Sequence, residues 1–340
     1  MSERKSVLVL PPSRLHPDAR ALLETEVGVV DGAGLDDRQL ADALAGAHGL
    51  VGGVQRAHLD AAPRLEVIGI PGSGADHIDV DGATERGVLV VNAAGGQATA
   101  VAEHAIGLML ALAKRIAVSD RIFHVEGRFL GRDHFTGSGW PGWPHEIGGK
   151  TIGIVGFGAI GRDLARKCRL GFDMRVLAFD PYCEPDTAAD IGVELVRSLA
   201  DLLPGCDFVS LHLPLTDATR NLIGEAELRA MRPTAVLVNL ARGGVVDEDA
   251  LLRALTEGWI AGAGLDVFAD EPGPDGLPLY GLDNVVCTAH IGGWVEEAVP
   301  RLAVLMAGEM LTALRGERPG RLVNPAAWDR RPSARNGGTA

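Results

Sequence analysis

Three side chains that could do chemistry follow short apolar runs in the second half of the chain: Arg242, Glu271 and His290. A guanidinium stays charged and matches the two oxygens of a carboxylate, and an imidazole exchanges protons near neutral pH. A nearby carboxylate orients the imidazole and favours its charged form. The set suits hydride transfer to a keto acid, with Arg242 binding the substrate carboxylate and polarising the carbonyl, His290 exchanging the proton and Glu271 orienting His290.

Each of these residues also has an ordinary structural interpretation. Arg242 could lie on the surface at a helix entry, His290 could be a core histidine, and Glu271, which precedes Pro272, could solvate a turn. In an open parallel sheet, however, ligands bind beyond the carboxyl ends of the strands. Three such side chains at the ends of adjacent expected strands therefore favour a catalytic site.

A glycine-rich turn precedes them, with Gly156, Gly158 and Gly161 between an apolar run and a helical pattern. Three glycines could form an ordinary loop, but a strand before them and a helix after them are typical of dinucleotide binding. Asp180 closes the next apolar run. Its carboxylate would accept hydrogen bonds from the adenosine ribose and repel a 2'-phosphate, which favours NAD over NADP.

The elements that must position these residues are short strands alternating with helical patterns. We expect six strands in the second half, at 151–155, 175–179, 208–211, 235–239, 262–266 and 285–287. Four runs, at 7–10, 50–51, 67–70 and 88–91, predict a smaller parallel sheet. The predicted fold is α/β, with two Rossmann-like domains containing doubly wound parallel sheets.

Two long helical patterns set the expected domain organisation, one at 98–116 and one at 296–314. The first leads into the nucleotide domain, and the second returns to the first domain. We expect a discontinuous substrate domain at 1–98 and 296–328, with an NAD-binding domain at 99–295 inserted in it. The polar stretch 329–340 is expected to be a disordered tail.

Composition limits the partners. The formal net charge of −13 argues against nucleic acid or an anionic membrane. The longest apolar run, 105–113, is shorter than the roughly 20 residues of a membrane span. The polar start of the chain lacks a signal-like core, so a cytoplasmic protein is expected. The four cysteines show neither pairing nor metal spacing, which predicts buried reduced thiols and no metal site.

The chain resembles the D-isomer-specific 2-hydroxyacid dehydrogenases, particularly their phosphoglycerate dehydrogenase-like branch, over about residues 50 to 325. The matching segments are 71–79, 100–104, the Gly156 turn, 180–182, 238–247, 264–268 with Glu271 and Pro272, and 290–293. The resemblance implies an NAD-dependent enzyme that interconverts a small anionic D-2-hydroxy acid and its 2-keto acid. It also implies a homodimer formed through the helices after residue 98.

The same resemblance implies roles for individual residues. Arg242, Glu271 and His290 are the implied catalytic residues. The implied cofactor-binding residues are Gly156, Gly158, Ala159, Ile160, Gly161, Asp180, Leu213, Pro214, Thr216, Leu240, Ala241, Asp266, Gly292 and Gly293, with Asp266 hydrogen-bonded to the nicotinamide amide. The implied substrate-binding residues are Gly72, Ser73, Gly74, Arg242 and Trp294. Backbone N–H groups of a glycine-rich loop suit a carboxylate, although Gly72 and Gly74 could form only a turn.

The chain departs from the family pattern where a phosphate would bind. Gly53 and Ile70 stand where phosphoglycerate enzymes place basic residues, although Arg56 lies nearby. We therefore predict that 3-phosphohydroxypyruvate is not the preferred substrate. Loop 131–149, with Arg132, His134, Trp140, Trp143 and His145, also departs from the family, and these tryptophans and Trp294 could simply pack against the protein.

Two other functions stay open. One is a phosphoglycerate or phosphonate-substrate dehydrogenase on the same scaffold. The other is a non-catalytic NAD-sensing binding protein, which the complete set of Arg242, Glu271 and His290 disfavours. A formate enzyme is disfavoured because relatives of that kind carry an amide where Glu271 stands.

Overall fold

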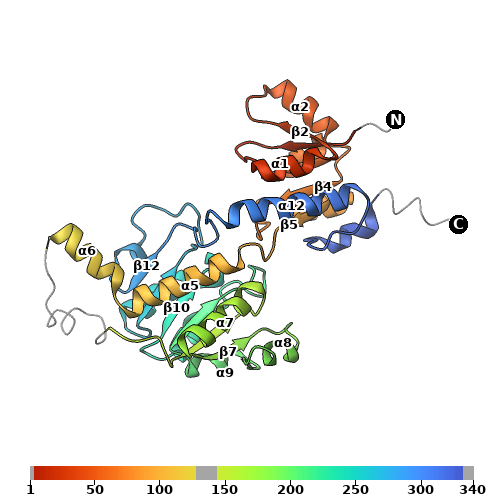
Figure 1. Ribbon diagram of the computed structural model, residues 1–340. Coiled ribbons are helices and arrows are strands. Elements are labelled where there is room, and N and C mark those ends of the chain that lie inside the picture. Colours follow the sequence, from red (N-terminus) through yellow and green to blue (C-terminus); the bar gives the residue numbers. More distant parts are fainter. Residues whose placement is uncertain (1–3, 128–143, 332–340) are drawn as a thin grey trace. The chain divides into compact units, whose positions relative to one another are not determined.

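The computed structural model describes residues 4–127 and 144–331 of the chain (Figure 1). Most of the loop singled out above, including Arg132, His134, Trp140 and Trp143, lies outside the described residues, as does 332–340. The chain divides into two compact units. Unit 1 comprises Met1–Gln97 and Trp294–Ala340, and unit 2 comprises Ala98–Gly293.

Unit 1 contains a five-stranded parallel sheet in the order β2-β1-β3-β4-β5. Its strands are β1 Ser6–Val9, β2 Gly28–Asp31, β3 Gly49–Val51, β4 Val67–Ile70 and β5 Leu89–Asn92. Its helices are α1 Pro17–Glu24, α2 Asp37–Gly46, α3 Arg56–Ala61, α4 Val80–Arg86 and α12 Ala298–Leu314. The order is that of flavodoxin-like doubly wound folds.

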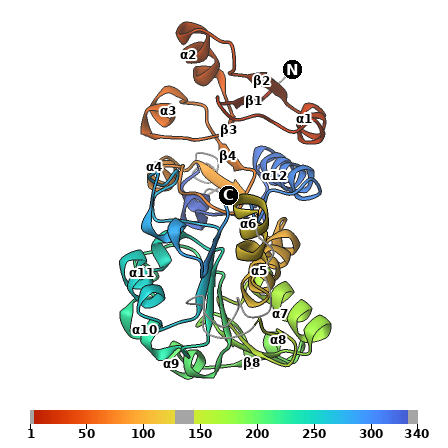
Figure 2. The ribbon, with the colours of Figure 1, turned by 90° about the vertical axis from the view of Figure 1, so that its left-hand side faces the viewer.

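Helices cover both faces of this sheet. Figure 2 shows α1 and α12 on one side of it and α2, α3 and α4 on the other. Helix α12 approaches closely at Gly69, where a Cβ atom would lie 2.3 Å from Sδ of Met310. The opposite face carries a core that includes Leu8, Leu50 and Ile68. The sheet of unit 1 is thus buried on both faces, as parallel sheets usually are.

Unit 2 contains a seven-stranded parallel sheet in the order β12-β11-β10-β9-β6-β7-β8. The strands are β6 Thr151–Val155, β7 Arg175–Phe179, β8 Glu194–Leu195, β9 Phe208–Leu211, β10 Val236–Asn239, β11 Gly262–Leu265 and β12 Val285–Cys287. The helices are α5 Ala98–Ala113, α6 Ile116–Glu126, α7 Ala159–Phe172, α8 Pro185–Ala189, α9 Leu199–Leu202, α10 Glu225–Ala230 and α11 Glu248–Thr256. The order reverses between β6 and β9, and dinucleotide folds bind their cofactor at such a reversal.

Two separate cores flank the sheet of unit 2. One joins α5 and α7 to strand residues such as Ile152 and Val238, and the other joins α10 and α11 to residues such as Val209 and Leu237. Figure 2 shows α5 and α7 on one side of the strands and α10 and α11 on the other. Because both faces are covered, the polar ends of the strands are the natural place for a ligand.

The predicted fold class is confirmed, and several elements differ in detail. The expected helix 98–116 is interrupted, because Arg115 has a left-handed backbone (φ 58°) that separates α5 from α6. Strands β2 and β8 were not predicted, since one is a half-exposed edge strand and the other has only two residues. None of the described helices is long and apolar enough to cross a bilayer.

The prediction for the cysteines is partly wrong. All four are free thiols, and Cys168 and Cys206 are buried, but Cys183 is half-buried and Cys287 is exposed. Cys287 lies in β12, an edge strand whose one described neighbour in the sheet is β11. Burial raises the pKa of the Cys168 and Cys206 thiols to about 12.

Candidate active site

The loop after β10 carries Arg242 at the carboxyl end of the unit 2 sheet. The side chain of Asn239 holds this loop, because its Oδ1 accepts from the Ala241 N–H (3.0 Å) and its Nδ2 donates to the Arg242 carbonyl (3.0 Å). Gly243 then passes so close to the loop after β11 that a Cβ atom would lie 1.8 Å from the carbonyl carbon of Phe268. Only glycine fits there. The loop with Arg242 is therefore packed directly against the loop that leads to Glu271.

Glu271 and His290 are in direct contact. Oε2 of Glu271 lies 2.6 Å from Nδ1 of His290, and Oε1 accepts from the Phe268 N–H at 3.0 Å. An ionised carboxylate only accepts hydrogen bonds, so Nδ1 of His290 is the donor. Nε2 is then the ring nitrogen that Glu271 leaves for another hydrogen-bond partner. Both side chains are partly exposed, at 46% for His290 and 36% for Glu271.

His290 has an unusual backbone for a residue without glycine's freedom, with φ 52°. Buried Asp266 holds the loop that follows it. Oδ1 of Asp266 accepts from the Ile291 N–H and Oδ2 accepts from the Gly292 N–H, each at 2.9 Å. Thr288 Oγ1 donates to Oδ1 at 2.6 Å. In this structure Asp266 thus holds the loop that carries His290.

The glycine-rich turn after β6 has the geometry that a dinucleotide needs. Gly156 has φ 90°, and a Cβ atom there would lie 2.3 Å from the His212 carbonyl oxygen. A Cβ on Gly161 would lie 2.3 Å from the Gly156 carbonyl oxygen. A Cβ on Gly158 would meet nothing within 4 Å, so this glycine faces open space. Gly156 and Gly161 therefore serve the fold of the turn, and Gly158 leaves room for a ligand.

The start of α7 fits a pyrophosphate. Its first residues are Ala159 and Ile160, and its N-cap, Gly158, provides no side-chain hydrogen bond to the free N–H groups of the first turn. Those groups and the helix dipole attract an anion. Asp180 lies beside the turn, because its Oδ2 accepts from the Phe157 N–H at 2.8 Å. The residues present fit NAD, with the carboxylate where the sequence predicted it.

The other predicted cofactor residues all follow carboxyl ends of strands of the same sheet. Leu213, Pro214 and Thr216 follow β9, Leu240 and Ala241 follow β10, Asp266 follows β11, and Gly292 and Gly293 follow β12. Gly292 is tightly enclosed, since a Cβ atom would lie 2.9 Å from Oδ2 of Asp266. The edge that carries Arg242, Glu271 and His290 thus also carries the predicted cofactor residues.

The predicted substrate-binding residues other than Arg242 belong to unit 1. Gly72, Ser73 and Gly74 follow β4, and the carbonyls of Gly72 and Ser73 accept from the Ala93 N–H and from Nδ2 of Asn92. Within the described part of the chain, the N–H groups of Gly72, Ser73 and Gly74 have no hydrogen-bond partner. Trp294 begins the second segment of unit 1, and its side chain is 72% exposed.

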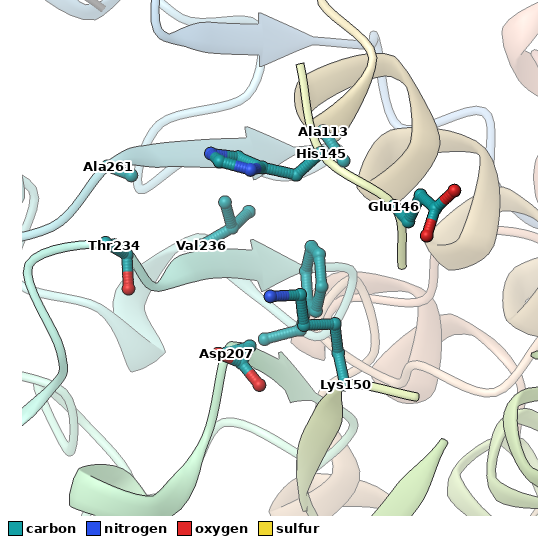
Figure 3. A pocket seen from close by; sticks show the side chains of 9 residues that line it. Ala113, His145, Glu146, Lys150, Asp207, Thr234, Val236 and Ala261 are labelled. Atoms are coloured by element: carbon teal, nitrogen blue, oxygen red, sulfur yellow. The ribbon is translucent and has the colours of Figure 1, made fainter. Parts of the chain in front are cut away.

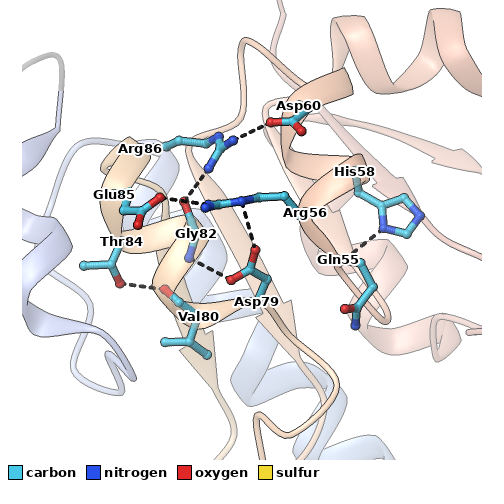
Figure 4. A network of polar contacts seen from close by, with 10 residues as sticks. All are labelled: Gln55, Arg56, His58, Asp60, Asp79, Val80, Gly82, Thr84, Glu85 and Arg86. Atoms are coloured by element: carbon cyan, nitrogen blue, oxygen red, sulfur yellow. Dashed lines mark hydrogen bonds and ion pairs between the residues drawn. The ribbon is translucent and has the colours of Figure 1, made fainter.

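Arg56, also in unit 1, is held by acidic side chains (Figure 4). Its Nη1 donates to Oε2 of Glu85 at 2.8 Å, and its Nε lies 3.8 Å from Oδ2 of Asp79. The hydrogen bond that Arg56 donates to Glu85 raises the pKa of the guanidinium. Arg56 thus already has two carboxylate neighbours.

A cavity of about 120 Å³ lies at the opposite, amino end of the unit 2 strands. Figure 3 shows the side chains of His145 and Lys150 beside it, with Thr234 and Val236 at the start of β10. None of the predicted catalytic or cofactor residues lines this cavity. The polar groups that can do chemistry are at the other end of the sheet.

Two residues of the site were missed from the sequence: His104 on α5 and Thr288 after β12. Nε2 of His104 lies 2.9 Å from Oγ1 of Thr288 and 3.6 Å from Oδ1 of Asp266. The strand-end rule could not find His104, because it lies on a helix. The motif 100–104 was its only signal in the sequence.

Comparisons with known proteins show which family the chain is similar to. The family model "D-isomer specific 2-hydroxyacid dehydrogenase, NAD binding domain" matches residues 106–292. The glyoxylate reductase of Pyrococcus furiosus is 45% identical over 266 residues, which are 77% of this chain and 77% of that protein. The D-3-phosphoglycerate dehydrogenase of Methanocaldococcus jannaschii is 40% identical over 94% of this chain, which spans only 59% of the length of that relative.

The fold is also that of solved enzymes. The holo form of D-mandelate dehydrogenase from Rhodotorula graminis superposes with a TM-score of 0.81 at 28% identity, covering 94% of this chain and 97% of the other.

Proposed function

Because the chain belongs to the D-isomer-specific 2-hydroxyacid dehydrogenase family and is thus an NAD-dependent oxidoreductase, we propose that Arg242, Glu271 and His290 interconvert a small D-2-hydroxy acid and its 2-keto acid. The observation that carries the proposal is the 2.6 Å contact between Glu271 Oε2 and His290 Nδ1 at the strand ends of the NAD-binding unit. That contact fixes which imidazole nitrogen is available to a substrate.

Each side chain has a separate task. Arg242 binds the substrate carboxylate and polarises the carbonyl, since its charge is permanent and its donors are forked. Nε2 of His290 gives a proton to the alkoxide oxygen during reduction and takes it back during oxidation. Glu271 holds Nδ1 and stabilises the imidazolium. NAD supplies the hydride acceptor, and its reduced form the hydride donor.

We assign the cofactor to the carboxyl end of the unit 2 sheet. The first turn of α7, at Ala159 and Ile160, would hold the pyrophosphate. Asp180 would accept from the adenosine ribose, and the residues after β9 would meet the adenosine. Leu240, Ala241, Gly292 and Gly293 are assigned to the nicotinamide region. Asp266 retains acceptor capacity on Oδ2, which accepts one hydrogen bond here, and would use it for the nicotinamide amide.

In unit 1 we assign the N–H groups of Gly72, Ser73 and Gly74 to the carboxylate of the substrate. Their lack of partners within the described residues supports this, because successive backbone N–H groups that remain free can bind an anion. Trp294, with its exposed ring, would limit the substrate side chain.

An unphosphorylated substrate such as glyoxylate or hydroxypyruvate fits better than 3-phosphohydroxypyruvate. Gly53 and Ile70 offer no charge to a distal phosphate. The guanidinium of Arg56, the basic residue that follows Gly53 closely in the sequence, is engaged by Glu85. A phosphonate-bearing substrate is disfavoured for the same reason.

The test is a panel of 2-keto acids with NADH, followed by the loss of absorbance as NADH is oxidised. Turnover separates the enzyme from the alternative, a non-catalytic NAD-sensing protein. His290→Ala should lower kcat by about 10² to 10⁴ while NADH still binds. A variant that kept the wild-type kcat would overturn the assignment of His290.

We further propose a cytoplasmic homodimer. The four free thiols suit a reducing compartment. Helix α6 exposes Ile116, Phe123 and Val125, the last at 77%, and large apolar side chains gathered on one helix are typical of interfaces. Phe123→Glu should shift the mass measured by light scattering from dimer to monomer. A wild-type monomer at micromolar concentration would contradict the proposal.

A further inference from the structure

We propose that His104 on α5 is a positioning residue for the reaction, which acts through Thr288 and Asp266 to hold His290 where Glu271 contacts it. The inference rests on the proposed function, since it concerns the presentation of the proton-exchanging imidazole. It goes beyond that function because it assigns a role to a helix residue outside the strand ends.

The direction of the hydrogen bonds follows from the groups themselves. Oγ1 of Thr288 lies 2.6 Å from Oδ1 of Asp266 and 2.9 Å from Nε2 of His104. A hydroxyl has one proton, and the carboxylate can only accept, so Thr288 donates to Asp266. Thr288 must therefore accept from His104, which requires a proton on Nε2 of that ring. The three side chains form a chain of donors that ends on Asp266.

Asp266 in turn holds the backbone around His290 by hydrogen bonds. Its carboxylate accepts from the N–H groups of Ile291 and Gly292, and its carbonyl accepts from the His290 N–H at 2.8 Å. His290 itself has a left-handed φ of 52°. Such a backbone persists only where the surroundings determine it. The anchors on Asp266 supply that determination on both sides of His290.

The helix that carries His104 is itself fixed against the sheet. Leu108 lies one turn after His104 on the same face of α5, and a Cβ atom on Gly264 would lie 2.9 Å from Cβ of Leu108. Gly264 is in β11, two residues before Asp266. The close approach of α5 at Gly264 thus sets the position of His104 relative to the Asp266 carboxylate.

His104 sits in a half-buried place, with 22% of its side chain exposed against 4% for Asp266. Its own Cδ2 would lie 3.4 Å from a Cβ on Gly292. The ring therefore also packs on the loop it orders. A bulky apolar ring would fill the same space and lose only the donor.

Two pairs of variants isolate the hydrogen bonds. His104→Phe removes the Nε2 donor and keeps a ring, and His104→Gln keeps a donor at nearly the same distance from the backbone. Thr288→Val removes the hydroxyl at constant shape, and Thr288→Ser keeps it. We expect His104→Phe and Thr288→Val to lower kcat about 10- to 100-fold, because a small misplacement of a catalytic group has effects of that size. The Gln and Ser variants should remain within about threefold of wild type.

Two readouts separate positioning from a general structural role. NADH affinity, measured by fluorescence titration, should change less than twofold in all four variants. In protein without cofactor, labelled with ¹⁵N-histidine, the Nδ1–H signal of His290 should shift or broaden in His104→Phe and stay in place in His104→Gln. The double variant His104→Phe/Thr288→Val should lose no more kcat than Thr288→Val alone, since both act through one chain.

Other results would overturn the inference. An unchanged His290 signal in His104→Phe would do so, as would an additive double variant. A loss of NADH affinity and thermal stability that matches the loss of kcat would leave His104 purely structural. The NMR result does not depend on turnover, so it stands or fails separately from the proposed function. A catalytically unimpaired His290→Ala would instead reject the function.

Discussion

Both units are built on doubly wound parallel sheets, and they differ in the turn that follows the first strand of each sheet in chain order. After β6, unit 2 has Gly156, Gly158 and Gly161, with free N–H groups at the start of a helix. After β1, unit 1 has Pro11 and Pro12. Proline has no N–H, so this turn cannot surround a phosphate with donors. The doubly wound sheet thus determines where a ligand can bind. The turn after the first strand determines whether that ligand can be a dinucleotide.

The strand ends differ in the same way. Unit 2 presents an acid, an imidazole and a guanidinium on loops that contact one another at Gly243 and at Glu271. Unit 1 presents the glycine loop at 72–74 and keeps its nearby charges paired, as Arg56 is with Glu85. From this difference we propose that unit 2 carries the catalytic side chains and that unit 1 favours an anion without a second charged group. The predictions below test this division.

The largest expected effect concerns phosphorylated substrate. We expect kcat/KM for hydroxypyruvate to exceed that for 3-phosphohydroxypyruvate, because two charge-assisted hydrogen bonds to the phosphate are missing at Gly53 and Ile70. At roughly 1.5 to 3 kcal/mol each, their loss amounts to a factor on the order of 10² to 10⁴ relative to a phosphate-specific enzyme. Initial rates with both substrates, side by side, give the ratio.

A matched variant sharpens this test. Glu85→Gln removes the strongest partner of Arg56 and should improve use of the phosphorylated substrate, whereas Asp37→Asn, on the exposed surface of α2, should not. A hundredfold preference of the wild-type protein for the phosphorylated form would refute the division between the units.

The next effect separates two glycines. Gly158→Ala adds a methyl group in open space where the pyrophosphate should lie, and Gly72→Ala adds one in open space beside the carboxylate loop. Neither glycine has a positive φ, so neither change should strain the protein. We expect Gly158→Ala to weaken NADH binding about 10- to 100-fold and Gly72→Ala to raise KM for the keto acid with NADH affinity unchanged. Fluorescence titration and steady-state kinetics measure the two quantities. If both variants weakened NADH equally, the units would not divide the ligands.

Much of this arrangement could be predicted from the sequence, because short apolar runs and glycine spacing report backbone requirements directly. The turn at Gly156 is an example: its φ of 90° and its closeness to His212 leave room for no other residue. Arg242, Glu271 and His290 were found because strand ends of a parallel sheet share one edge. The contact between Glu271 and His290 confirms that two of them meet.

The remainder depends on tertiary contacts that no local pattern records. His104 meets Thr288 only because α5 packs on Gly264. The break at Arg115 follows no glycine or proline, so the sequence continued the helix through it. Asp266 was assigned to the cofactor, and its three hydrogen bonds to the loop at 288–292 could not be foreseen. Sequence found the chemical groups, and the structure shows how they are held.

A moderate effect is expected for cofactor choice in unit 2. Asp180→Ala removes the carboxylate that would repel a 2'-phosphate, so the preference for NADH over NADPH should shrink by about 10- to 100-fold. The variant also loses the acceptor for the Phe157 N–H, and NADH affinity should fall slightly. Ratios of kcat/KM with the two reduced cofactors measure the change. A wild-type protein that used NADPH as efficiently as NADH would contradict the proposal that Asp180 discriminates against the 2'-phosphate.

The smallest expected effect concerns the support of the unit 2 turn. Behind Gly156 lies His212, whose Nε2 lies 2.8 Å from Oγ of Ser210 and whose buried Nδ1 has no hydrogen-bond partner within the described residues. Burial lowers the pKa of His212 to about 3. In the unfolded chain the imidazole of His212 has an ordinary pKa of about 6.5. The unfolded state therefore takes up a proton first, and the free energy of unfolding falls as the pH drops from about 6.5 towards 3. Above about 6.5 both states are neutral and this loss of stability is absent.

Between pH 7 and pH 5.5 this single group should lower the free energy of unfolding by about 1 kcal/mol. His212→Gln removes the titration and keeps a polar group near Ser210. Urea unfolding of both proteins at the two pH values gives the difference, and the fall should be about 1 kcal/mol smaller in the variant. Equal decreases in the free energy of unfolding of the two proteins would show that protonation of His212 does not destabilise the fold.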